Sequence, residues 1–178
     1  FFKTTSPSMD ILVSSNLERL LYHVTGSDTE VAALMKSLAE TGSYTVRPET
    51  LRTIQESFAC GWSSEEQVAG EIRARYEQDG YLCDTHTAVA FHVAAQHKRD
   101  GVPMVVLSTA SPFKFPRSVL EALGQTAPAN DFEAMQQLEE ITGRTAPASL
   151  SALRRKAERF NTVIDPEQIA QVALSYQA

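Results

Sequence analysis

The chain has 178 residues, of which 43% are hydrophobic and 21% charged, so its composition fits one globular unit and excludes a disordered tail. Its formal net charge of -6 argues against nucleic acid, because phosphates require a basic surface. Its apolar stretches, such as Val102 to Ala110, are shorter than the ~20 residues of a membrane-spanning helix. We therefore expect a small-molecule partner, with no nucleic acid and no membrane.

The two cysteines, Cys60 and Cys83, are too few for a disulfide framework and are spaced unlike zinc ligands. This usage is typical of a reduced, cytoplasmic protein. Cys60 and Trp62 are expected to fill gaps in the core. The first five residues lack an initiator methionine and a signal-peptide pattern, which predicts a piece of a longer protein.

Helical patterns dominate the first 80 residues. Residues 1–13 predict a strand or loop, because Pro7 favours extended geometry in the residue before it. Four amphipathic helices are then predicted: one capped by residues 14–16 and ending at Gly26, one from Ser27 to before Gly42, one beginning at Pro48, and one from Ser63 to Gly80.

The middle of the chain has a different pattern. Residues 87–97 predict a helix that is apolar nearly all round and therefore buried. Residues 103–107 predict a strand covered on both faces. One strand leaves its backbone groups unpaired, so the rest of the sheet is expected in another part of a longer parent. Further helices are predicted before Gly124 and over residues 130–141, 148–160 and 166–176.

Ser108 and Thr109 directly follow the predicted strand. Ligands of open α/β sheets bind at the carboxyl ends of strands. A threonine hydroxyl is suited to a heteroaromatic nitrogen, because it donates one hydrogen bond and accepts others. The alternative is a turn threonine that caps its neighbours. Position alone leaves both roles open.

Three blocks of the sequence resemble threonine synthases of the bacterial and fungal type. They are Thr5 to Leu21, Gly80 to Ala90, and Ser108 to Phe115. The second block is similar to the family segment Gly-Tyr…Asp-Pro-His-Thr-Ala-Val, and the third to Thr-Ala-His-Pro-Ala-Lys-Phe. The resemblance runs from residue 1 to about residue 125, and the last helices match only in outline.

The sequence departs from the family pattern at three positions. Thr85 stands where proline is usual, and Ser111 and Phe113 stand where histidine and alanine are common. Thr85 predicts a less rigid turn before His86, and Ser111 removes an imidazole from the site. Neither change affects Thr109.

The resemblance implies the carboxy-terminal part of a helix-rich α/β enzyme with the tryptophan-synthase-like fold (fold type II) that binds pyridoxal 5'-phosphate. It implies that residues 1–24 and 81–125 belong to the cofactor-binding α/β domain. Residues 25–80 would form a helical insertion, and residues 126–178 the carboxy-terminal helices. The family reaction converts O-phospho-L-homoserine and water into L-threonine and phosphate, by elimination of phosphate and then addition of water.

The resemblance also implies roles for individual residues. In the family, the threonine that matches Thr109 donates a hydrogen bond to the pyridine nitrogen of the cofactor, so Thr109 and its neighbour Ser108 are predicted to bind it. The first block lies near the family's active-site cleft, and we expect weaker substrate contacts from Ser6, Ser8, Asp10 and Asn16, although turns and caps use the same residue types.

His86 has two possible roles, in placing the substrate or as a structural hydrogen-bond partner at a helix start. No metal is predicted, because the histidines share no ligand spacing with carboxylates or thiols. None of the five lysines lies in the family's Schiff-base motif, and no Gly-x-Gly series is present for a phosphate loop. We therefore predict no catalytic residue here, and expect the chain alone to be inactive without the amino-terminal part of its parent.

Two alternatives stay open at this point. One is a non-catalytic helical binding module, for which the acidic surface and the amphipathic helices would suffice. The other is a different lyase of the same fold type, which would share the cofactor and differ in the substrate cleft. The sequence Ser108-Thr109-Ala110 after a buried strand separates the enzymes from the helical module, which has no use for it.

Overall fold

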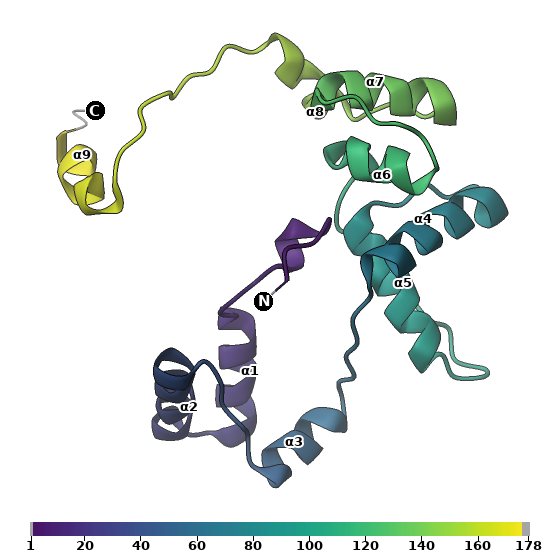
Figure 1. Ribbon diagram of the computed structural model, residues 1–178. Helices are drawn as coiled ribbons and strands as arrows, with labels where there is room; N and C mark the ends of the chain where they lie inside the picture. Colours follow the sequence, from purple (N-terminus) through teal and green to yellow (C-terminus); the bar gives the residue numbers. More distant parts are fainter. Residues whose placement is uncertain (1, 176–178) are drawn as a thin grey trace. The chain divides into compact units, whose positions relative to one another are not determined.

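The computed structural model describes residues 2–175, and helices with connecting loops make up that part of the chain (Figure 1). It divides into two compact units, Phe1–Ala146 and Pro147–Ala178. The helices of the first unit are α1 (Ser15–Thr25), α2 (Asp28–Thr41), α3 (Pro48–Gln55), α4 (Glu65–Asp79), α5 (Thr85–His97), α6 (Pro116–Ala122) and α7 (Asp131–Thr142). Two 3-10 turns, η1 (Pro7–Met9) and η2 (Pro112–Lys114), accompany them.

The helix starts follow from capping side chains. Five helices begin after a residue whose side chain accepts a backbone N–H of the first turn. These capping residues are Ser14, Ser27, Ser64, Asp84 and Asn130. Gly26 and Gly80 end α1 and α4 with φ of 63°, a left-handed conformation that favours glycine. The four helices predicted within the first 80 residues are confirmed, and the helix predicted from residue 87 begins two residues earlier.

The core of the first unit lies among α4, α6 and α7, where α4 packs on α5 and α6, and α6 packs on α7. Its fully buried side chains include Ile72, Leu120 and Leu138. A separate set of contacts joins α1 to α2 and α3, with Leu21 and Val31 as the buried apolar residues. Helices thus bury much apolar surface only where several of them meet.

The second unit consists of short pieces: α8 (Ala148–Ser151), η3 (Ala152–Arg155), η4 (Pro166–Gln168) and α9 (Ile169–Ser175). The prediction of one helix over 148–160 is wrong beyond Arg155, because residues 156–165 are not helical. No residue of this unit is buried within the part that the structure describes. Short helices without a packing partner are marginal in water, which explains the early end.

The predicted burial of the middle segment is also wrong in two respects. Only the first turn of α5, Thr85 to Ala88, is buried, and its last residues are exposed. Residues 102–107 form no strand, and Val105 and Leu107 are 78% and 74% exposed. A strand needs neighbours to satisfy its backbone, and within residues 2–175 there is no sheet to join.

The connector between α3 and α4 differs from expectation as well. Cys60 and Trp62 are both exposed, so the prediction that they fill the core is wrong. Gly61 between them approaches α5 closely: a Cβ at this position would lie 3.0 Å from a methyl group of Val93. Across residues 2–175, no helix combines the length and apolar character needed to cross a membrane.

Candidate functional site

The carboxylate of Asp84 is the centre of a hydrogen-bonded cluster at the amino-terminal end of α5. Asp84 is fully buried, and its Oδ1 accepts the backbone N–H groups of His86 (2.9 Å) and Thr87 (3.3 Å). The Thr87 hydroxyl donates to Oδ2. A buried carboxylate is tolerated only where donors satisfy it, and a helix N-terminus supplies them. Asp84 therefore anchors both the helix and the loop before it.

The imidazole of His86 joins this anchor to the start of the chain. Its Nδ1 lies 3.0 Å from Asp84 Oδ1, and its Nε2 accepts the Ser8 backbone N–H at 3.1 Å. A ring nitrogen that accepts an N–H carries no proton, so the proton is assigned to Nδ1, which donates to Asp84. The ring is buried and lies 4.7 Å from the Phe115 ring between centroids. This is the geometry of a structural hydrogen-bond partner.

Residues 4–10 form a closed turn around η1. The Asp10 carboxylate accepts the Thr4 backbone N–H at 2.8 Å and the Thr4 hydroxyl at 2.7 Å. These two hydrogen bonds, the backbone one first, hold the pKa of the Asp10 carboxyl below its ordinary value of 3.8. The Thr4 hydroxyl oxygen also accepts the Ser6 N–H at 3.1 Å. Of the two forms predicted for the start of the chain, the loop is therefore the one observed.

The hydroxyl of Ser6 is buried by this turn without a hydrogen-bond partner. The residue is 2% exposed, and no atom within residues 2–175 pairs with its Oγ. A buried polar group left unpaired costs about 1–3 kcal/mol, so its presence calls for an explanation such as a ligand. Ser8, by contrast, has an exposed side chain and contributes its backbone N–H to the cluster.

Thr85, the first residue of α5, also bonds to the turn of residues 4–10. Its hydroxyl donates to the Thr5 carbonyl oxygen at 2.9 Å, and the residue is 1% exposed. The Thr85 hydroxyl thus forms a bond that proline lacks the donor to make, and the rigidity of the turn before His86 stays a prediction. Ser111, the other polar departure, caps η2 by accepting the Phe113 N–H.

Of the predicted cofactor-binding pair, Ser108 lies beside Thr87. Ser108 Oγ is 3.5 Å from Thr87 Oγ1, at the limit of hydrogen-bond distance. Thr109 follows with an exposed side chain. None of the hydrogen bonds recorded within residues 2–175 involves its hydroxyl, so the turn-capping role is not the one this conformation shows.

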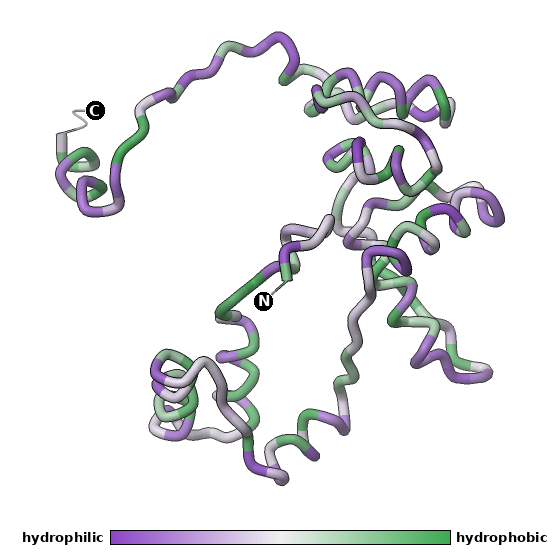
Figure 2. The backbone as a smooth tube through the Cα atoms, in the orientation of Figure 1, coloured by the Kyte–Doolittle hydropathy of each residue, from purple (hydrophilic) through white to green (hydrophobic). Residues whose placement is uncertain are grey.

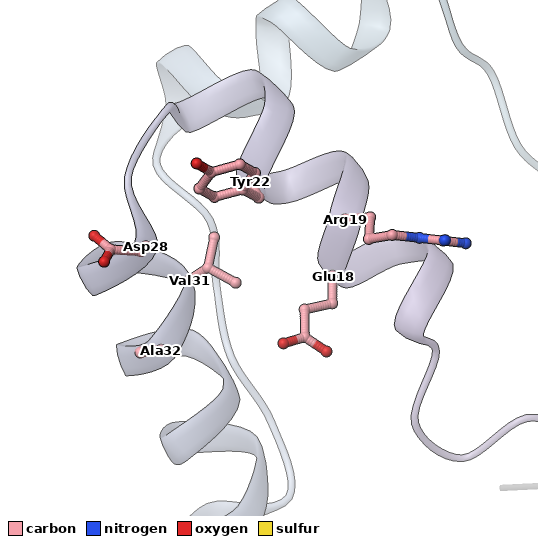
Figure 3. A pocket seen from close by; sticks show the side chains of 6 residues that line it. All are labelled: Glu18, Arg19, Tyr22, Asp28, Val31 and Ala32. Atoms are coloured by element: carbon pink, nitrogen blue, oxygen red, sulfur yellow. The ribbon is translucent and has the colours of Figure 1, made fainter.

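Asn16 does not join the cluster in the part of the chain that the structure describes. Its exposed side chain, in the first turn of α1, accepts a hydrogen bond from Arg19. A separate open hollow of about 320 Å³ lies between α1 and α2 (Figure 3). Its lining residues are Glu18, Arg19, Tyr22, Asp28, Val31 and Ala32. The charged residues of this lining are Glu18, Arg19 and Asp28, and in Figure 3 Glu18 extends toward the space between the two helices.

The structure thus brings together Ser6, Ser8, Asp10, His86 and Ser108, with Thr109 adjacent. Sequence reasoning missed Asp84, Thr85 and Thr87 as members of this cluster. A signal for one of them was present, since aspartate is a preferred N-cap residue and Asp84 directly precedes the helix. Within residues 2–175, no group of three His, Cys, Asp or Glu side chains is placed to hold a metal ion.

Comparisons with known proteins agree with one another. A family profile described as "Threonine synthase, C-terminal" matches residues 87–173, which extends the resemblance well beyond residue 125. The threonine synthase of Pseudomonas aeruginosa is 36% identical over 170 residues, which cover 94% of this chain and 32% of that protein. The chain therefore spans about a third of the length of this curated relative.

Two solved structures share the fold. The threonine synthase of Brucella melitensis, solved with pyridoxal phosphate bound, is 34% identical and superposes with a TM-score of 0.66, over 87% of this chain and 35% of that one. Yeast threonine synthase is 25% identical with a TM-score of 0.74, over 98% of this chain and 36% of that one. The chain has the fold of the carboxy-terminal portion of these fold type II enzymes, and its sequence is similar to that portion of threonine synthases.

Proposed function

We propose that this chain forms the carboxy-terminal part of a pyridoxal-phosphate-dependent threonine synthase, a carbon–oxygen lyase that converts O-phospho-L-homoserine and water into L-threonine and phosphate. The observation that carries the proposal is the junction at the start of α5. There Ser8 bonds to His86, and Thr87 approaches Ser108, so all three blocks that resemble the family meet. A helical binding module has no need of such a junction.

Thr109 is the group we assign to the cofactor. Its hydroxyl is exposed and has no recorded partner within residues 2–175, which fits an outside acceptor such as a pyridine nitrogen. Its neighbour Ser108 lies near the Asp84 cluster, with its Oγ 3.5 Å from Thr87 Oγ1. Pyridoxal phosphate, when bound, supplies an electron sink for negative charge on the substrate carbon. The neutral Thr109 hydroxyl would donate to the pyridine nitrogen and leave it mostly unprotonated, which would moderate that sink.

Substrate contacts are assigned to the turn of residues 4–10. The buried, unpaired Ser6 hydroxyl supports a polar ligand at this place. Ser8 and Asp10 lie on the same turn, and His86 holds the turn through Ser8. Asn16 remains a candidate in the first turn of α1, where Arg19 lies beside it.

The division of the parent follows from the same assignment. We place residues 1–24 and 81–125 in the cofactor-binding domain, 25–80 in a helical insertion, and 126–178 in the carboxy-terminal helices. The Schiff-base lysine would come from the amino-terminal part of the parent chain, so this chain alone would not turn over substrate. A cytoplasmic location is proposed from the two free cysteines.

The test is phosphate release from O-phospho-L-homoserine by the full-length parent with pyridoxal phosphate. We expect release by the parent, strong reduction in Thr109→Ala, and none from the isolated chain. Thr109→Ser is the matched control, because it keeps the hydroxyl and should retain most of the activity. A parent that binds the cofactor but leaves this substrate untouched would keep the fold assignment and discard the substrate. Turnover by the isolated chain would overturn the proposed division of labour.

A further inference from the structure

We propose that Thr85 is a positioning residue: together with His86 it holds the turn of residues 4–10 on the first turn of α5 at two points. One point is the Thr85 hydroxyl on the Thr5 carbonyl oxygen. The other is His86 Nε2 on the Ser8 backbone N–H. Ser6, with its buried unpaired hydroxyl, lies between these two points in the sequence.

The two contacts constrain the turn in complementary ways. Thr85 donates to the turn and His86 accepts from it, so the polarity of the pair fixes the direction of the bound segment. Both contacts join residues about 80 positions apart in the chain, where each bond must offset a large loss of chain entropy. The Thr5 backbone N–H also donates to the Glu65 carboxylate of α4 at 3.1 Å, so the two α5 contacts act together with a third long-range hydrogen bond of the same turn.

The protons around Thr85 can be arranged so that both contacts form at the same time. The Thr85 oxygen lies 3.3 Å from His86 Nδ1, whose proton is directed to Asp84 at 3.0 Å. With that proton on Nδ1, the Thr85 hydroxyl proton is free to go to the Thr5 carbonyl, and Nε2 is free to accept from Ser8. We call the two contacts, from Thr85 to Thr5 and from Ser8 to His86, the clamp. One tautomer of His86 therefore satisfies both of its hydrogen bonds.

The helix cap does not depend on the Thr85 hydroxyl. Asp84 caps α5 through the N–H groups of His86 and Thr87, so removing the Thr85 hydroxyl leaves the cap intact. Proline fits the position too: Asp84 has extended backbone with φ of -81° and ψ of 170°, the conformation that precedes proline, and Thr85 is the first residue of the helix. Two different substitutions, Thr85→Val and Thr85→Pro, thus remove the hydroxyl with the helix start preserved.

The experiment is amide hydrogen exchange by NMR on the isotope-labelled chain and its variants. We expect Thr85→Val and Thr85→Pro to lower the protection of the Ser8 amide about 5-fold, the effect of one hydrogen bond. The Ala88 amide, which bonds to the Asp84 carbonyl, serves as the internal reference and should not change. Thr85→Ser restores the donor and should rescue the Ser8 protection. The nitrogen shifts of His86 should show the proton on Nδ1 in the wild-type chain.

Unchanged Ser8 protection in both hydroxyl-free variants would overturn the clamp, and so would a failure of Thr85→Ser to rescue. If Thr85→Val lowers protection throughout the chain, Thr85→Pro decides the question. The result does not involve cofactor or substrate, so it stands apart from the proposed function. The functional consequence rests on that function: in the parent, Thr85→Val should raise KM for O-phospho-L-homoserine more than it lowers kcat, with Thr85→Ser restoring KM. A parent without this activity would remove the consequence and leave the clamp.

Discussion

Two regions of the first unit differ sharply in what they do with apolar side chains. Among α4, α6 and α7, residues such as Ile72, Leu120 and Leu138 are completely buried. In residues 102–107, and in the link Ile11 to Val13 that appears green in Figure 2, comparable side chains are mostly exposed. The exposed Val105 and Leu107 are as apolar as the buried Ile72, so the hydropathy of a side chain does not by itself decide its burial. Burial depends on whether a second apolar surface is present to cover the first.

This difference in burial agrees with the finding that the chain spans only about a third of the length of its relative. The covered region is closed by helices of this chain, whereas the exposed apolar runs have no covering element within residues 2–175, and the relatives are about three times longer than this chain. Thr109 ends one such run, and the turn of residues 4–10 precedes the other. The candidate site therefore borders both exposed runs.

The largest expected difference between a covered and an exposed side chain is the reactivity of the two cysteine thiols. Burial, followed by the nearby Asp84 carboxylate, raises the pKa of the Cys83 thiol from 9.0 to about 12. At about pH 8, roughly one Cys83 in ten thousand is then thiolate, the reactive form. We expect an aromatic disulfide reagent to modify the exposed Cys60 quickly and Cys83 at least about 1000-fold more slowly in the folded chain. Cys60→Ser should leave no fast thiol, and two fast thiols in the native chain would contradict the burial of Cys83.

Core truncation gives the next largest effect. Leu120→Ala should lower the free energy of unfolding by about 2–5 kcal/mol, since it empties a site with no exposed surface. Leu107→Ala removes the same atoms from a side chain that is 74% exposed and should change stability by less than about 0.5 kcal/mol. Urea unfolding of the two variants measures the difference. Equal losses would show that residues 102–107 are covered in solution.

Acid should loosen the turn of residues 4–10 slightly. The pKa of Asp10 is lowered in the folded chain, so the ionised carboxylate contributes stability that is complete above the ordinary pKa of 3.8 and is lost as the pH falls through the folded value. The protection of the Thr4 amide, corrected for intrinsic exchange, should therefore fall below about pH 4. Asp10→Asn should abolish this acid dependence. A wild-type profile as flat as that of Asp10→Asn would show that the Thr4 contacts do not form in solution.

Much of the fold could be predicted from local chemistry. Capping side chains and terminal glycines give the bounds of α1, α2 and α4 closely, because these signals act within a few residues. Burial could not be predicted in the same way. The apolar surfaces of residues 102–107 and of α5 depend on distant neighbours, and so does the exposure of Trp62.

The site shows the same limit. The resemblance pointed to Ser6, Ser8, His86 and Ser108, and the structure connects them. For Thr85 the resemblance predicted a less rigid turn before His86, because proline is usual at this position of the helix start. The Thr5 carbonyl that Thr85 holds lies 80 residues earlier in the chain, so no local pattern could identify the bond. A long-range hydrogen bond becomes visible only when both segments are placed.

The exposed run before Thr109 has a consequence for the order of assembly. Only Ser108 separates residues 102–107 from Thr109. If these residues pair with a sheet, the pairing therefore also sets the position and direction of the Thr109 hydroxyl. The pocket for the pyridine ring would then be completed late, by strand pairing, while the Asp84 junction is already formed within this chain. Cofactor capture would in that case report that the two parts of the enzyme have joined.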